Sequence, residues 1–108
     1  MTDASSWLHG TDKIGGTCVV ALAGELDMSC SGAIRQLLLD ELAATSVVSV
    51  IADLSRVSFI DSTIISALIA AYLRAEETGR QFQVSDPQPR VRDVLDLTGV
   101  LGMLMPTS

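Results

Sequence analysis

The spacing of apolar residues changes between two periods along the chain, which predicts alternating strands and helices. Thr17–Ala23 is a short apolar run that ends before Gly24, as is typical of a strand. Residues 29–44 have a helical pattern, with Ile34, Leu37, Leu38 and Leu42 on one face. The apolar run at 47–52 shows little alternation, as expected of a strand buried on both faces. The expected strands are 7–13, 17–23, 47–52, 81–85 and a final edge strand at 103–105, and the expected helices are 29–44, 62–78 and a third from Pro89 to Gly99.

This order of elements predicts an α/β fold with partly parallel strand pairing. The length of 108 residues fits one domain over 1–108, with residues 1–6 expected to form a flexible N-terminus. Hydrophobic residues make up 48% of the chain and mean hydropathy is +0.42, so a sizeable core is expected. Aromatic residues are only 4%, which makes that core aliphatic.

The charge balance excludes some classes of partner. Thirteen acidic residues face seven basic ones, giving a net charge of -6. A nucleic-acid binder or a protein held on anionic lipid needs a basic surface, so neither is expected. The most apolar run, Ser62–Leu73, is shorter than the roughly 20 residues of a membrane span. With no signal segment at the N-terminus, we expect a cytoplasmic protein without membrane insertion.

The residues that usually carry catalysis are sparse, so we expect no enzyme activity. His9 is the single histidine and Lys13 the single lysine, and neither lies in a phosphate-binding or catalytic motif. Cys18 and Cys30 have neither the spacing of metal ligands nor an evident base beside them. We therefore expect no metal and no cofactor, and both thiols to serve packing in a reducing compartment.

The segment Val57–Thr63 carries the candidate chemistry, because it leads from a strand or loop into a strongly apolar helix. Asp61 or Ser62 can act as an N-cap that satisfies an otherwise unpaired main-chain N–H. A second interpretation uses the same geometry: a phosphorylated hydroxyl at a helix N-terminus has N–H donors and a favourable dipole nearby. The two interpretations are compatible.

The helix at 62–78 carries few charges on the side expected to face outward. We expect one face to pack inward and the opposite one to form a flat surface suited to a partner. The alternative is a helix buried on both sides. The inward residues are Ile65, Leu68, Ile69 and Tyr72, and the opposite ones are Thr63, Ala67, Ala70 and Arg74.

Three segments, in order, resemble the STAS domain family. Gly24–Asp27 is similar to its Gly-Glu-Leu-Asp signature, and Leu95–Val100 is similar to its C-terminal helix end. Val57–Thr63 resembles the segment that carries the phosphorylated serine in bacterial anti-sigma factor antagonists. The matches span Val19 to about Met105, which is nearly the whole chain.

The resemblance implies a single STAS domain: a mixed sheet of four or five strands with helices mainly on one face. It also implies an anti-sigma factor antagonist that regulates sigma-factor-dependent transcription by partner switching. The unphosphorylated form would bind an anti-sigma factor that is also a serine kinase, phosphorylation would release it, and a serine phosphatase would restore binding. Ser62 maps to the phosphorylated serine, ahead of its neighbouring hydroxyl Thr63, and Asp61 maps to the acid before it. Asp27 maps to the acidic residue of the contact surface, and Asp61, Ser62 and Thr63 are expected to contact the partner as well.

The chain departs from the family pattern after Thr63. The family commonly continues with Gly-Leu-Gly, whereas this chain has Ile64, Ile65 and Ser66. Ile64 is expected either to be buried or to obstruct a close approach by another chain. The departure favours an alternative function, a non-switching STAS interaction or scaffold module in a signalling or transporter-associated complex. Binding of a nucleotide or small ligand is a third class, supported by fold analogy alone.

Overall fold

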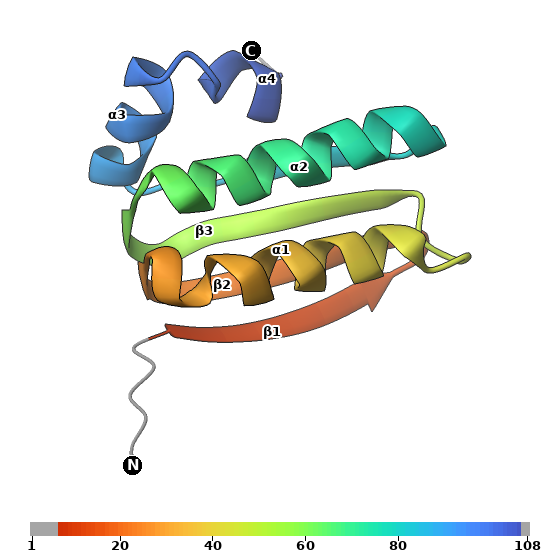
Figure 1. Ribbon diagram of the computed structural model, residues 1–108. Helices are drawn as coiled ribbons and strands as arrows, with labels where there is room; N and C mark the ends of the chain where they lie inside the picture. Colours follow the sequence, from red (N-terminus) through yellow and green to blue (C-terminus); the bar gives the residue numbers. More distant parts are fainter. Residues whose placement is uncertain (1–6, 107–108) are drawn as a thin grey trace.

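The computed structural model describes residues 7–106, which form four strands and four helices (Figure 1). The expected flexible N-terminus, residues 1–6, lies outside the described residues. Strands and helices alternate after the first hairpin, as the sequence predicts. The elements are β1 (Trp7–Ile14), β2 (Thr17–Leu26), α1 (Met28–Ala43), β3 (Ser49–Ile60), α2 (Ser62–Thr78), β4 (Gln81–Ser85), α3 (Pro89–Leu97) and α4 (Leu101–Leu104).

The strands form one mixed sheet in the order β1-β2-β3-β4. β1 and β2 are antiparallel and joined by a two-residue turn, in which Gly15 has a φ of 62° that favours glycine. β2, β3 and β4 run parallel, because a helix connects each strand to the next. The carboxyl ends of β2 and β3 therefore lie together, at the starts of α1 and α2.

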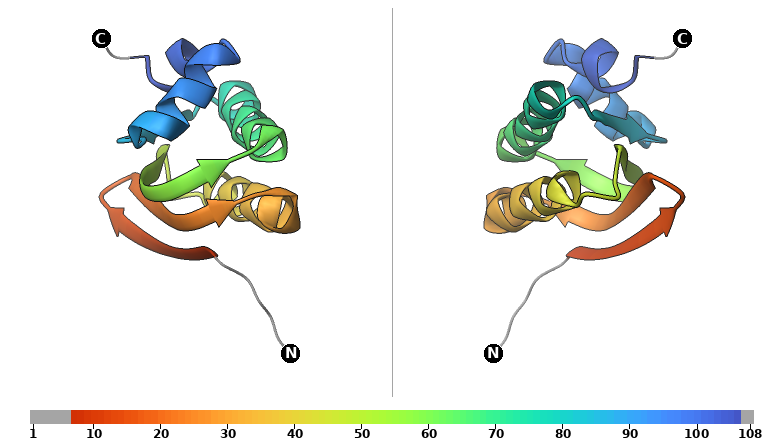
Figure 2. Two further views of the ribbon diagram at one scale, coloured as in Figure 1. Left: turned by 90° about the vertical axis from the view of Figure 1, so that its left-hand side faces the viewer. Right: turned by 90° about the vertical axis from the view of Figure 1, so that its right-hand side faces the viewer.

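Helices α1 and α2 lie side by side across one face of the sheet (Figures 1 and 2). From Cys18 to Leu22 every second residue of β2 points into the core beneath them, and the intervening ones are half-buried. The core is aliphatic, as expected, and both cysteines are buried free thiols within it. Along α1, the buried positions include Ile34, Leu38 and Leu42, which confirms the inward face given by the periodicity.

β3 is longer than the predicted 47–52 strand and runs to Ile60. β4 pairs only with its first part, Ser49–Asp53. α3 packs against β3, and Gln88, the residue before α3, donates its side-chain N–H to the Ser55 carbonyl at 3.0 Å. Helices α3 and α4 thus lie beyond the short β4, at that edge of the sheet (Figure 1).

The expected strand at 103–105 is wrong, because this segment belongs to the short helix α4 and to its end. The N–H groups of Met103 and Leu104 both bond to the Val100 carbonyl, at 3.1 and 3.0 Å. This helical turn buries Leu104 completely. Three apolar residues do not distinguish a strand from one helical turn, and local hydrogen bonds decide for the helix.

The other predicted helix ends are confirmed. Gly79 follows α2 with a left-handed φ of 72°, and its N–H bonds to carbonyls of the last turn. Pro89 is in the first turn of α3, and Gly99 follows it with a φ of 80°. Within residues 7–106, no helix has both the length and the apolar character needed to cross a membrane.

Candidate functional site

Asp27 and Asp61 occupy equivalent positions at the ends of two neighbouring parallel strands. Leu26, the last residue of β2, pairs with Ile60, the last residue of β3, and each aspartate comes next. Asp27 caps α1 by accepting bonds from the Ser29 N–H at 2.9 Å and the Ser29 hydroxyl at 2.6 Å. The topology therefore brings together two acidic residues that are 34 positions apart in the sequence.

Asp61 caps α2 with a larger set of hydrogen bonds. Its Oδ1 accepts from the Thr63 hydroxyl at 2.6 Å and from the N–H groups of Thr63 and Ile64 at 3.0 and 3.2 Å. The Thr63 hydroxyl above all, together with these N–H groups, lowers the pKa of Asp61 against the opposing effect of burial. Asp61 is therefore held as a carboxylate at the start of α2.

The two neighbouring hydroxyls at the start of α2 have different environments. The Thr63 hydroxyl is half-buried and donates to Asp61. Ser62 is exposed, and its hydroxyl has no hydrogen-bond partner among residues 7–106. A modifying enzyme can therefore reach Ser62 without breaking a bond, whereas Thr63 must first give up its bond to the capping aspartate. Ser62 is therefore the more accessible of the two hydroxyls.

The donors at the start of α2 are largely occupied. Thr63 and Ile64 give their N–H groups to the Asp61 side chain, and Ile64 and Ile65 also donate to the Asp61 carbonyl. A phosphate on Ser62 would therefore compete with the Asp61 carboxylate for the same donors. Its charge would stay largely uncompensated at the surface.

A shallow groove of about 240 Å³ runs between the first halves of α1 and α2. Its lining comes equally from both helices, including Thr63 of the predicted site. Gly32 is exposed, and the space where a Cβ would lie is open. The lining residues are Ser31, Gly32 and Arg35 of α1, and Thr63, Ser66 and Ala67 of α2.

Ala67 does not form the exposed surface that the helical pattern predicts. It is only 3% exposed, because α1 packs alongside α2 and covers this position. Ser66 is exposed instead, one residue earlier. The sequence analysis did not predict that Ser31 and Arg35 of α1 line this groove. The residues around them do not indicate which helix packs against α2.

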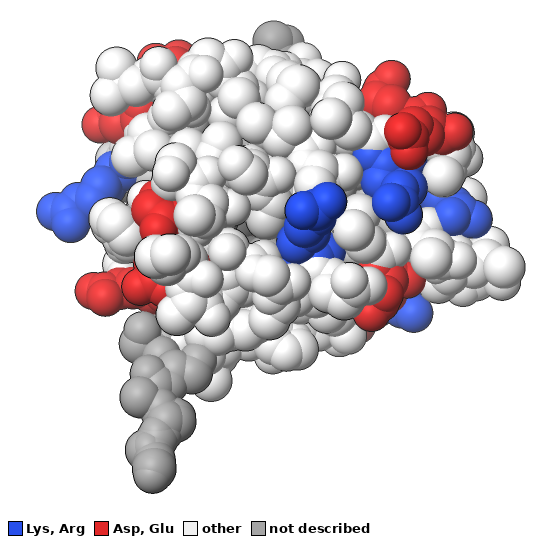
Figure 3. All heavy atoms as spheres, viewed as in Figure 1, with Lys and Arg blue, Asp and Glu red and all other residues white. Residues whose placement is uncertain are grey.

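Ala70 and Arg74 lie farther along α2 from the two aspartates. Ala70 is half-buried, and Arg74 is exposed and pairs with Glu77 at 3.6 Å. The main chain of Arg74 lies about 18 Å from that of Ser62 along the helix axis, because each residue adds a rise of about 1.5 Å. The twelve residues Ser62–Leu73 contain no charged side chain, and much of the surface over α1 and α2 is uncharged in Figure 3. The predicted outward face is therefore largely covered, since only Arg74 of its four residues is exposed, and the helix is closer to the alternative of burial on both sides.

Ile64, which replaces the first family glycine, is fully buried beneath α2. It belongs to the main apolar core and leaves the outer surface of the helix clear. Of the two outcomes expected for this residue, burial is the one observed.

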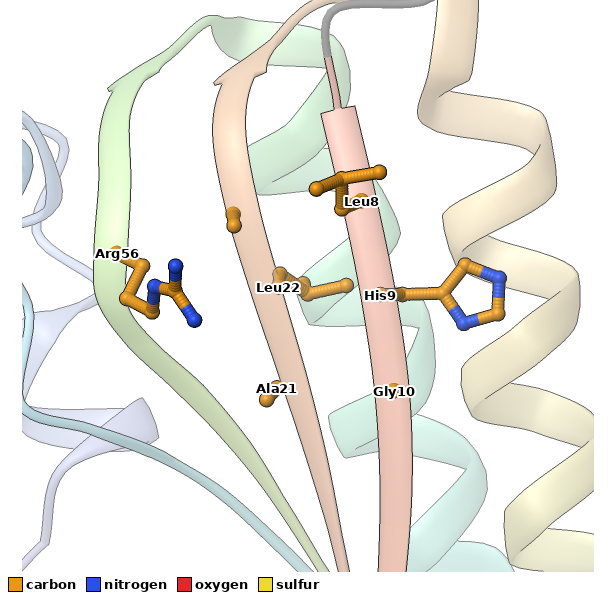
Figure 4. Close-up of a pocket in the computed structure, with 7 residues that line it drawn as sticks. Leu8, His9, Gly10, Ala21, Leu22 and Arg56 are labelled. Atoms are coloured by element: carbon orange, nitrogen blue, oxygen red, sulfur yellow. The ribbon is translucent and has the colours of Figure 1, made fainter.

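A second hollow, of about 300 Å³, lies over β1 and β2, where Leu8, Gly10, Ala21 and Arg56 border it (Figure 4). Its lining contains a histidine and an arginine but no carboxylate or thiol. Within residues 7–106 no three His, Cys, Asp or Glu side chains are grouped to hold a metal ion. Burial raises the pKa of the Cys18 thiol to about 11, so this residue is unsuited to act as a nucleophile.

A family model described as the STAS domain matches residues 10–108. The chain is also 25% identical to an anti-sigma F factor antagonist of Paenibacillus polymyxa over 89 residues, which are 82% of this chain and 76% of that protein.

Solved structures of anti-sigma factor antagonists are also similar to this chain. An anti-sigma factor antagonist from Mycobacterium paratuberculosis superposes with a TM-score of 0.82 at 27% identity, over 99% of this chain and 92% of that one. The unphosphorylated form of the anti-sigma factor antagonist SpoIIAA gives a TM-score of 0.78 at 26% identity, over 90% and 84% of the two chains. The phosphorylated form of SpoIIAA, described as a Bacillus cell fate determinant, gives 0.71 at 24% identity, over 90% and 87%.

Proposed function

The chain belongs to the STAS domain family, and on that premise we propose that it acts as an anti-sigma factor antagonist controlled by phosphorylation of Ser62. The unphosphorylated protein binds a kinase-type anti-sigma factor and frees the sigma factor. Phosphorylation by that partner ends the contact, and a serine phosphatase restores it. The protein itself has no catalytic role, and we place it in the cytoplasm.

One observation carries the proposal: Ser62 is an exposed hydroxyl that directly follows the helix-capping Asp61. The similarity to anti-sigma factor antagonists supports the same role, and SpoIIAA is known in unphosphorylated and phosphorylated forms. The partner surface that we propose has three parts. The first is the start of α2 with the neighbouring cap of α1: Asp27, Asp61, Ser62 and Thr63. The second is the groove, with Gly32, Arg35, Ser66 and Ala67, and the third continues along α2 through Ala70 to Arg74.

The physical basis of the switch is the charge added at one point of that surface. A phosphate brings a charge of about -1.5 to -2 to Ser62. The donors of Thr63 and Ile64 are engaged by Asp61, so the new charge is not neutralised locally. Covering it with a partner requires removing its water while Asp61 stays close by, and this costs binding energy. No rearrangement of the fold is needed.

The test compares wild type, Ser62→Ala and Ser62→Asp for binding to the cognate anti-sigma factor. We expect Ser62→Ala to bind as wild type and Ser62→Asp to bind at least about tenfold more weakly, a difference of about 1.4 kcal/mol. Thr63→Val is the matched control for phosphorylation: incubation with the kinase and ATP should still add one phosphate to it. Equal binding of the three Ser62 forms would reject the switch and leave the non-switching module.

A further inference from the structure

The outer edge of β1 is a second surface with a specific pattern. β1 pairs with β2 along one edge, and no other strand within residues 7–106 pairs with it. All eight of its residues are in register with β2 without a bulge, and none is proline. Proteins usually protect an edge strand with charged side chains, a proline, a bulge or a very short length. β1 carries the charged Asp12 and Lys13 but has no proline, bulge or shortening, so its main-chain groups remain able to pair.

The hairpin geometry defines which main-chain groups this edge presents. In a two-residue hairpin the closing pair, here Ile14 and Thr17, is hydrogen-bonded, and bonded pairs then alternate along the antiparallel ladder. Gly10 and Asp12 therefore direct their N–H and carbonyl groups toward β2. His9, Thr11 and Lys13 direct theirs away from it, to the free edge.

β1 also carries two exposed apolar side chains that a pairing strand could cover. Leu8 and Ile14 are each 72% exposed, although both are large and apolar. They are six residues apart, so they lie on the same side of the strand. Leu8 pairs with Ala23 of β2 and borders the hollow of Figure 4 together with Ala21. Thr11 lies at the midpoint between Leu8 and Ile14.

We infer that β1 pairs antiparallel with β1 of a second copy, with Thr11 opposite Thr11, to form one continuous sheet across a symmetric dimer. In this register Leu8 of each copy lies opposite Ile14 of the other. The symmetric dimer therefore contains two such apolar contacts, one at each end of the paired strands. The outward main-chain groups also match, because His9 then faces Lys13 as a hydrogen-bonded pair. The Lys13 ammonium is paired with Glu41 of its own chain at 3.2 Å, which limits its repulsion of other groups.

The surface area argues for a reversible dimer. Eight residues of edge pairing bury less than the roughly 1,200 Å² of a standard stable interface. We therefore expect a dissociation constant between about 10 µM and 1 mM. Ser62 begins α2 directly after β3, and β2 lies between β3 and β1 in the sheet (Figure 1). The dimer therefore leaves both Ser62 sites uncovered, independently of the function proposed for them.

Sedimentation of the full chain between about 10 µM and 1 mM tests the pairing. We expect the mean mass to rise from one chain toward two, and a constant monomer mass would overturn the inference. The double variant Leu8→Lys/Ile14→Lys places lysines opposite each other and should remain monomeric. The variant Leu8→Lys/Ile14→Glu places Lys opposite Glu in this register only, and should keep the dimer with added sensitivity to salt.

Two comparisons complete the experiment. Thr11→Asp puts two carboxylates opposite each other and should abolish the dimer, whereas Thr45→Asp adds the same charge at an exposed turn and should not change it. Equal self-association of the Lys/Lys and Lys/Glu variants, or equal loss with Thr11→Asp and Thr45→Asp, would overturn the pairing. Thermal melts verify that each variant is folded, as expected for exposed positions.

Discussion

Asp27 and Asp61 directly follow two paired residues, Leu26 of β2 and Ile60 of β3, so the two aspartates cap neighbouring helix starts. Asp61 receives two N–H groups and the Thr63 hydroxyl from its own helix. Asp27, at the equivalent position before α1, receives bonds only from Ser29 among the described residues. The two aspartates occupy similar positions in the sequence, but Asp61 accepts more hydrogen bonds than Asp27.

This difference predicts unequal costs when each aspartate is removed. Asp61→Ala should lower the free energy of unfolding by about 2 kcal/mol and Asp27→Ala by about 1 kcal/mol, the range expected for N-cap losses. The larger cost follows from the additional donors that Asp61 satisfies. Urea denaturation of the two variants and wild type measures both values. A larger cost for Asp27→Ala would contradict the hydrogen-bond assignment.

The lowered pKa of Asp61 predicts how its contribution depends on pH. A carboxyl group whose pKa is lower in the folded state stabilises the fold above its unfolded pKa, which is about 3.9. That contribution is lost as pH falls through the lower folded pKa. The stability difference between wild type and Asp61→Asn should therefore be full at pH 6 and shrink below about pH 4. A difference that stays constant down to pH 2 in thermal melts would exclude this coupling.

Ile64 and Ser66 replace family glycines but should differ strongly in what they contribute. Ile64 is fully buried, so Ile64→Gly should cost about 3–5 kcal/mol through the lost side chain and the helix penalty of glycine. Ser66 is exposed, and Ser66→Gly should cost about 1 kcal/mol or less. Denaturant titration of both variants gives the comparison. Similar costs would mean that Ile64 is not packed in the core as described.

The sequence predicted most of this architecture because periodicity and helix ends are local properties. The α1 face, Gly79 and Pro89 follow from patterns within a few residues, and the structure confirms them. The same local reasoning predicts a cap at Asp61 or Ser62, and the structure has it at Asp61. What the sequence did not reveal depends on contacts between distant segments: the burial of Ala67 under α1, and the pairing of Leu26 with Ile60 that places Asp27 beside Asp61.

The groove between α1 and α2 allows a direct test of the proposed partner surface. Ser66→Trp should fill the groove and weaken binding to the anti-sigma factor at least about tenfold. Its effect on stability should be small, because Ser66 is exposed. Thr45→Trp adds the same bulk at the exposed turn after α1, and it should bind as wild type. If both variants bind equally well, the groove is not part of the contact.

The central claim is that phosphate on Ser62 controls binding to the partner. Calorimetric titration of the anti-sigma factor with unphosphorylated protein, and with protein phosphorylated at Ser62 as verified by intact mass, measures this directly. We expect affinity to fall by about 10- to 100-fold on phosphorylation, or roughly 1.4 to 2.7 kcal/mol. Equal affinities of the two forms would contradict the account.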